Sequence, residues 1–201
     1  MMFGKTNKFY HDIVECLIAA LEARDVYTKG HSTRVANMTE DLAGKIGLRG
    51  KELEKVHIAA HLHDIGKIGI SDQILNKKGK LLNHEFEIIK THPIIGYNIL
   101  SRSSRLREIA KIVLYHHERW DGKGYPDGLK GLTIPLGARI IAICDSIDAM
   151  ASKRPYRSPL DWQEIREEII SNKGTQFDPV LVDEIDEMLW DKWRKMYLNS
   201  Y

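Results

Sequence analysis

The residues of this chain that could do chemistry are histidines and acidic residues, and two of them, His63 and Asp64, are adjacent. An imidazole beside a carboxylate offers ligands that suit a divalent metal such as Fe, Mn, Ni or Zn. The alternative is structural: His63 would lie at a helix C-terminus, where the helix dipole favours it, and Asp64 would cap the turn. Taken alone, this pair does not decide between a metal site and a helix end.

Two more histidines, His116 and His117, are adjacent at the end of an apolar segment and precede a glycine-rich stretch. The structural alternative is one buried, hydrogen-bonded histidine beside an exposed one. Asp145 directly follows the apolar run 140–144, where a carboxylate is costly to bury unless it is paired or bound to a metal. A salt bridge to Arg139 is the alternative for Asp145.

Two further histidines stand where helices or turns are expected to begin. His31 opens a predicted helix after Gly30, so an N-terminal helix cap is its structural alternative. His92 precedes Pro93 and could be a turn residue. Each of these positions therefore has an ordinary structural explanation when it is considered separately.

The elements that must position these residues are predicted to be helices. Apolar residues recur at helical spacing in eight stretches, over residues 13–21, 35–46, 56–64, 84–100, 104–117, 137–151, 160–170 and from 179 to 189. No segment alternates with period two, and only residues 118–135 are typical of a long loop. We therefore expect an all-α fold, a helical bundle in a single domain.

The composition is typical of a globular chain, with 43% hydrophobic and 29% charged residues. A net charge of +2 gives no reason to expect nucleic acid binding, and two distant cysteines exclude a zinc site built from a CxxC motif. No signal peptide is visible, and no apolar run approaches the ~20 residues that cross a bilayer. We expect one domain over residues 1–201 in the cytoplasm, without membrane contact.

Taken together, the histidine and acidic segments resemble the HD-GYP domain family in order and spacing. The matching segments are His31 to Val35 (HSTRV), His63 to Lys67 (HDIGK), Thr91 to Pro93 (THP), His116 to Pro126 (HHERWDGKGYP), Asp145 and Ser152 to Arg157 (SKRPYR). The resemblance covers roughly residues 10–190, and the stretch around GYP is long and specific. It implies the all-helical HD superfamily fold and a metal-dependent phosphodiesterase that opens cyclic di-GMP.

The resemblance also implies which residues bind metal and substrate. The implied metal ligands are His31, His63, Asp64, His92, His116, His117 and Asp145. Asp64 would bridge two ions, and Lys67 would reach the scissile phosphate, which makes these two the implied catalytic residues. The implied substrate-binding residues are Lys67, Tyr125, Arg154 and Arg157.

One departure from the family sets the expected number of metals. Some members carry a glutamate four residues before the first histidine and use it for a third metal, whereas this chain has Tyr27 there. We therefore expect two divalent ions, Fe or Mn first, with Ni or Zn as alternatives. Such ions would activate a hydroxide that attacks phosphorus, giving pGpG and, after a second cut, GMP. Asp148, one turn from Asp145, is expected to support a ligand.

Four histidines stay outside the implied site. His57 and His61 have the i, i+4 spacing that can bind metal, but His61 lies two residues from His63 and so faces roughly the opposite side of the helix. We interpret His57 and His61 as polar-face or interface residues. We expect His11 and His84 to face solvent.

Two other functions stay open at this point. A phosphohydrolase of another nucleotide, such as a different cyclic dinucleotide, would carry the same metal motif. The second alternative is a catalytically silent binding domain, because GYP surfaces are implicated in contacts with cyclase domains. The seven intact candidate ligands favour an active enzyme over this alternative. Few residues precede the family match, so control is expected from a cyclase-domain or sensor-protein partner in trans, from the level of expression, or from a longer protein of which this chain is the catalytic domain.

Overall fold

The computed structural model describes residues 3–25, 30–153 and 158–198, with side chains from residue 12 onward within these ranges. The longer helices are α1 (Phe3–Glu22), α2 (His31–Lys45), α3 (Gly50–Leu62), α6 (His92–Leu100), α7 (Arg107–Leu114), α8 (Leu136–Ala151), α9 (Trp162–Ser171) and α11 (Glu187–Leu198). Shorter elements are η1 (Ile65–Gly69), α4 (Asp72–Leu75), α5 (Asn83–Ile89), η2 (Ser104–Leu106), η3 (Gly131–Thr133) and α10 (Pro179–Asp183). The described ranges contain no β-strand, which confirms the predicted all-α class.

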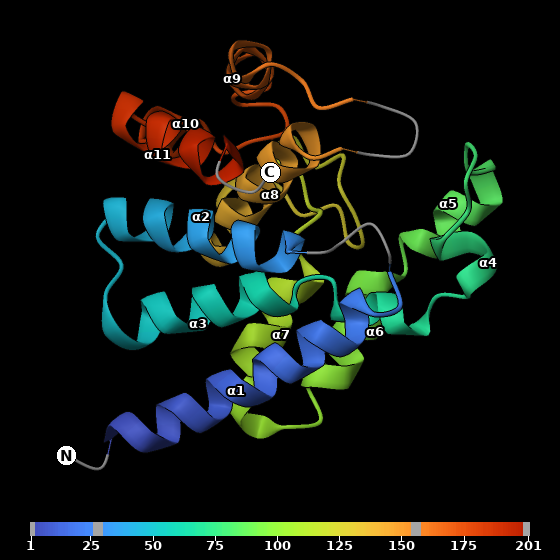
Figure 1. Cartoon of the computed structure of the whole chain (residues 1–201). Helices are drawn as coiled ribbons and strands as arrows, with labels where there is room; N and C mark the ends of the chain where they lie inside the picture. The colour runs from blue at the N-terminus through green and yellow to red at the C-terminus, as the bar shows by residue number, and fades with distance from the viewer. Residues whose placement is uncertain (1–2, 26–29, 154–157, 199–201) are drawn as a thin grey trace.

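The helices pack in layers around the hairpin formed by α2 and α3 (Figure 1). Helix α8 packs against α2, and α7 packs against both α3 and α6. The C-terminal helices α9, α10 and α11 lie over α8 and α2, on the side of the molecule away from α1. The short helices α4 and α5 project from the bundle as an arm.

Helix α8 runs through the centre of the hydrophobic core. Its residues Ile140, Ile141, Ile143 and Ile147 are completely buried, and one cluster of buried apolar side chains joins them to α2, α3, α7 and the C-terminal helices. A helix that is apolar on most sides is expected in such a central position. Any acidic residue in the middle of α8 must therefore have a partner inside the protein.

Three predicted helices are wrong at their boundaries, and two of these boundaries matter for the site. The predicted helix 84–100 is two helices, because Pro93 stands in the first turn of α6 and favours a new helix start. The predicted helix 104–117 ends at Leu114, so the adjacent histidines follow α7 instead of lying in it. The last predicted helix is α10 and α11, with Asp186 accepting a hydrogen bond from the backbone N–H of Leu189 at the start of α11.

Among the described residues, no helix combines the length and the apolar character needed to cross a bilayer.

Candidate metal centre

The candidate ligands come from the ends of four helices and from the middle of a fifth. His31 is the first residue of α2, His63 and Asp64 directly follow α3, and His92 is the first residue of α6. His116 and His117 follow α7, and Asp145 lies in α8. Chain segments up to 114 residues apart in sequence thus meet at one place in the bundle.

The absence of a side chain at Gly66 allows α3 and α6 to bring their histidines together. A Cβ atom at Gly66 would lie 1.9 Å from the carbonyl oxygen of His92 and 2.5 Å from the backbone nitrogen of Gly96. No other residue type fits there without moving α6. The glycine of the segment HDIGK is therefore a packing requirement of the site.

The first group consists of His31, His63 and Asp64, all three buried, with Asp145 beside them. The Nε2 atoms of His31 and His63 are 3.2 Å apart. One carboxylate oxygen of Asp145 lies 3.4 Å from Nε2 of His31 and 3.9 Å from Nε2 of His63. The alternative salt bridge between Asp145 and Arg139 is wrong, because Arg139 pairs with Asp178.

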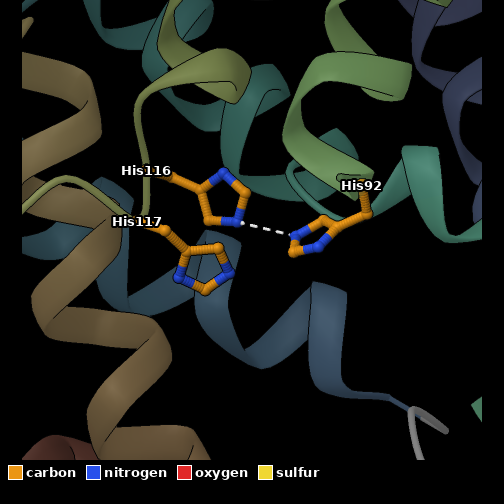
Figure 2. Close-up of side chains that lie close together, drawn as sticks. All are labelled: His92, His116 and His117. Atoms are coloured by element: carbon orange, nitrogen blue, oxygen red, sulfur yellow. Dashed lines mark hydrogen bonds between the residues drawn. The ribbon is translucent and has the colours of Figure 1, made fainter. Parts of the chain in front are cut away.

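The second group consists of His92, His116 and His117 (Figure 2). The Nε2 atoms of His92 and His116 are 3.3 Å apart, and the ring of His117 lies 4.0 Å from that of His116 between centroids. His92 and His116 are buried, whereas His117 is partly exposed. The structural alternative of one buried and one exposed histidine at 116–117 is not what is found, because His117 is only partly exposed and both rings lie beside His92.

Asp64 lies between the two groups and faces both. Its Oδ2 atom is 3.6 Å from Nε2 of His31 and 3.4 Å from Nε2 of His63. Its Oδ1 atom is 3.3 Å from Nε2 of His92. Asp64 could therefore offer one carboxylate oxygen to each histidine group if both groups bound a cation.

Hydrogen bonds at the Nδ1 atoms orient four of the histidines toward the space between them. His63 donates to the carbonyl oxygen of Ala60, His92 to that of Ile89 and His116 to that of Val113, at 2.7, 2.8 and 2.6 Å. His31 donates to a carboxylate oxygen of Asp148 at 2.7 Å. Because carbonyl and carboxylate oxygens only accept, Nδ1 carries a proton in all four rings, and in the neutral form of each ring Nε2 is the nitrogen with the lone pair. Lone pairs that face each other at 3.2–3.3 Å repel unless a cation or a proton lies between them, so the donor set fits divalent cations.

The two groups differ in the pKa of their histidines. Burial opposes the charged form of His31, but hydrogen bonds and attraction from Asp148, Asp64 and Asp145 outweigh it and raise its pKa to about 10. In the second group the effect of burial is the largest. Burial lowers the pKa of His92, and burial together with repulsion from His92 lowers the pKa of His117 to about 3. The second group is therefore neutral at pH 7, the form in which an imidazole binds a metal.

Asp148 is the centre of a buried network that holds His31 in place. Besides His31, its carboxylate accepts hydrogen bonds from Arg34 Nε at 2.6 Å, from Ser152 Oγ at 3.1 Å and from the Tyr197 hydroxyl of α11. These donors hold the pKa of Asp148 well below its usual range in spite of burial. The contact with His31 agrees with the prediction that Asp148 supports a ligand, and it connects α2, α8 and α11.

Lys67 lies in η1 with its ammonium group against the bridging carboxylate. Its Nζ atom is 2.7 Å from Asp64 Oδ2 and 3.6 Å from Asp25 Oδ2. Burial lowers the pKa of Lys67, but the two carboxylates outweigh it, so the net pKa is raised. Arg24, two residues after the end of α1, donates to the backbone carbonyl oxygens of Lys67, Ile68 and Ile70 and so fixes this segment.

The loop after α7 folds over the second group. The ring of Tyr125 lies 4.8 Å from that of His117, and the ammonium group of Lys90 is 5.3 Å from the Tyr125 centroid. Glu118, which is buried, accepts hydrogen bonds from the backbone N–H groups of Asp127 and Gly128. Tyr125 is thus held at the edge of the candidate centre.

Three predicted positions, Arg154, Arg157 and Tyr27, lie outside the described residues. Sequence reasoning missed two contributors, Asp25 and Tyr197, because nothing in their local sequence marks them. Only the folded chain brings them to Lys67 and Asp148.

The histidines outside the implied site are only partly as predicted. His84 is exposed, as expected, and the side chain of His11 lies outside the described part. His61, however, is not on a polar face: only 3% of it is exposed, and its Nε2 atom lies 3.2 Å from Nε2 of His57. The polar-face interpretation of His61 is therefore wrong, because His61 is buried in a helix that packs against several others, including α2 and α7.

Comparison with known proteins places this centre in a family. The HD domain model matches residues 15–181, a stretch that contains every candidate ligand. A cyclic di-GMP phosphodiesterase of Thermotoga maritima is 42% identical over 198 residues, which cover 96% of this chain and 54% of that protein. The 3′3′-cGAMP-specific phosphodiesterase 2 of Vibrio cholerae is 44% identical over 184 residues, covering 90% of this chain and 35% of that protein.

The chain thus spans about half the length of these relatives or less. Among solved structures, the HD domain of the L. monocytogenes phosphodiesterase PgpH superposes with a TM-score of 0.66 at 23% identity, covering 90% of this chain and 98% of that one. This likeness shows the fold. The matched model and the similarity to these relatives confirm the resemblance carried by the motifs: the chain belongs to the HD domain family.

Proposed function

We propose that this chain is a metal-dependent phosphodiesterase that hydrolyses cyclic di-GMP to pGpG, with GMP as the product of a second cut. The observation that carries the proposal is the position of Asp64, whose two carboxylate oxygens face two separate histidine groups. Similarity to a protein named cyclic di-GMP phosphodiesterase supports the choice of substrate.

The proposed centre holds two divalent ions, Fe or Mn in preference to Ni or Zn. The first ion would be bound by His31, His63, Asp64 and Asp145, and the second by Asp64, His92, His116 and His117. When bound, a pair of such ions supplies a nucleophile from water at neutral pH and stabilises negative charge on the phosphate oxygens.

The protein's own groups prepare the phosphodiester for this attack. Lys67 stays protonated because two carboxylates face it, and its N–H groups can donate to a phosphate oxygen. Burial raises the pKa of Tyr125, so its hydroxyl stays neutral and its ring offers a flat face beside His117. Arg154 and Arg157 complete the proposed phosphate contacts. The anion is thereby neutralised and oriented before any bond is broken.

The experiment is product analysis with the whole chain loaded with Fe²⁺ or Mn²⁺. Cyclic di-GMP is added, and chromatography follows the appearance of pGpG and GMP over time. We expect pGpG first and activity that disappears when a chelator removes the metal. A fully loaded protein that leaves cyclic di-GMP intact would overturn the proposal.

A second candidate substrate is 3′3′-cGAMP, because the Vibrio cholerae relative named for it is 44% identical, slightly more than the cyclic di-GMP relative. The metal centre acts on the phosphodiester and does not distinguish the bases. Parallel measurements of kcat/KM for both dinucleotides decide between them: a ratio above about tenfold assigns the preferred substrate, since this corresponds to about 1.4 kcal/mol.

A catalytically silent binding role is the less favoured alternative, because such a role does not require all seven candidate ligands. We also propose a single domain over residues 1–201, a cytoplasmic location and control by a cyclase-domain or sensor partner in trans. Co-purification of tagged protein from its natural host, with and without cyclic di-GMP, tests the partner.

A further inference from the structure

Close pairs of histidine Nε2 atoms occur at three places in the described part of the chain. Two of them, at 3.2 and 3.3 Å, belong to the two groups of the candidate metal centre. The third pair, His57 and His61, shows the same separation of 3.2 Å and belongs to neither group.

The third pair is formed by one turn of a single helix. His57 and His61 are four residues apart on α3, so their side chains point to the same side of the helix. Their rings lie edge to face, with centroids 4.7 Å apart and planes at 78°. The pair His31 and His63 has a similar arrangement, with centroids 5.1 Å apart and planes at 65°.

A carboxylate also lies near His57, at a longer distance than the 2.7 Å that separates Asp148 from His31. Glu40 of α2 places Oε2 3.3 Å from Nδ1 of His57. A carboxylate at this distance places negative charge beside the two imidazoles, which favours a cation bound between them.

We propose that His57 and His61 form a further site for a borderline divalent cation such as Zn²⁺ or Ni²⁺, separate from the two-ion centre. Two imidazoles that bind one tetrahedral ion at 2.0–2.1 Å place their nitrogens about 3.3 Å apart, close to the distance observed here. The side chain of His57 is 18% exposed, which gives the ion a path from solvent and room for water as the remaining ligands. Having only two protein ligands, this site fills after the two-ion centre.

The site also has a structural consequence, because its parts come from two helices. The carboxylate belongs to α2 and both histidines belong to α3, the two helices of the central hairpin. An ion held by this pair therefore fixes the orientation of the His57 ring against α2. Binding should raise the thermal stability of the chain even when the two-ion centre is disabled.

The test is equilibrium dialysis of the whole chain against Zn²⁺, with the bound metal counted for each chain. We expect three ions for the wild type, two for His57→Gln and three for the matched control His84→Gln, which changes an exposed histidine. In the Asp64→Ala background we expect one ion, and none when His57→Gln is added. A Glu40→Gln variant keeps both ligands and should bind the third ion about 10- to 100-fold more weakly.

The outcomes separate this site from the proposed two-ion centre. A wild type that stops at two ions, or a His57→Gln protein that still binds three, overturns the inference. A rise in melting temperature with Zn²⁺ in Asp64→Ala, absent from the double variant, supports it. If the wild type binds only the ion at His57 and His61, the two-ion centre is refuted and the α3 site stands. If the wild type binds only two ions and both are lost in Asp64→Ala, the α3 site is refuted and the two-ion centre stands.

Discussion

The buried network around Asp148 predicts that Asp148→Asn weakens metal binding although Asp148 is not itself a proposed ligand. The asparagine side chain keeps one acceptor, but its NH₂ group must face donors, because His31, Arg34 and Tyr197 all donate to this position. The ring of His31 then loses the charged acceptor that holds Nε2 toward the centre.

The size of the effect follows from burial and from the number of bonds. Asp148 is 1% exposed and pairs with the guanidinium group of Arg34, and breaking a buried ion pair costs about 3–5 kcal/mol. For a chain of this length each kcal/mol lowers the melting temperature by about 2–4 °C, so the expected decrease is about 6–20 °C. Loss of a group that orients a metal ligand weakens metal binding by about 10- to 100-fold.

The assay is calorimetric titration of the metal-free protein with Mn²⁺, together with thermal unfolding of the same samples. Tyr197→Phe is the matched control, because it removes one donor to Asp148 but leaves the bond to His31. It should cost about 1.5–3 kcal/mol of stability, with a much smaller effect on metal affinity. Equal metal affinity in Asp148→Asn and the wild type would refute the idea that Asp148 positions His31.

Three further predictions concern pH, Lys67 and Gly66. The metal-free protein should be most stable near pH 6.5. Below this pH the unfolded chain takes up a proton at His117, whereas the folded chain does not, because burial lowers the pKa of His117 to about 3. Above this pH the folded chain keeps a proton on His31, whose pKa is about 10, whereas the unfolded chain has lost it, so stability falls on both sides. Each of these two histidines changes the free energy of unfolding by up to about 1.4 kcal/mol per pH unit. A free energy of unfolding that stays constant from pH 5 to 8, measured with denaturant, would contradict the pKa shifts of His31 and His117. Lys67→Met should lower kcat/KM by about 10²- to 10³-fold while metal analysis still finds two ions, and loss of metal would instead make Lys67 a structural residue. Gly66→Ala should lower the free energy of unfolding by more than about 3 kcal/mol, measured by denaturant unfolding, because a Cβ atom there would lie 1.9 Å from a backbone oxygen. Gly79→Ala is the control: its Cβ atom would meet nothing within 4 Å, so the free energy of unfolding should change by less than about 0.5 kcal/mol.

The helical class and the grouping of the candidate ligands could be predicted from the sequence for different reasons. Helical periodicity depends only on the local spacing of apolar residues, so the sequence predicts the helices without knowledge of how they pack. The ligands were predicted from a family resemblance, and the structure places His31 beside His63 and His92 beside His116, pairs that are 32 and 24 residues apart. Spacing alone would not have paired them, because their separation depends on how the helices pack.

The remaining features depend on tertiary contacts that leave no mark in local sequence. Tyr197 is an ordinary apolar-stripe residue of its helix, yet its hydroxyl reaches Asp148. His61 has the spacing of a polar pair with His57, but the packing of α3 into the bundle buries it. The start of a new helix at His92 and the end of α7 before His116 were not predicted, because the helical spacing of apolar residues continues across both boundaries although the backbone turns there.

The most direct test of the two-ion phosphodiesterase is Asp64→Ala, with metal content and cyclic di-GMP hydrolysis measured on the same preparation. Asp64 directs one carboxylate oxygen toward each histidine group, so its loss should remove bound Fe or Mn from both and abolish the formation of pGpG. Circular dichroism of the variant shows whether it is folded. A folded Asp64→Ala protein that keeps two ions and still hydrolyses cyclic di-GMP would contradict the account.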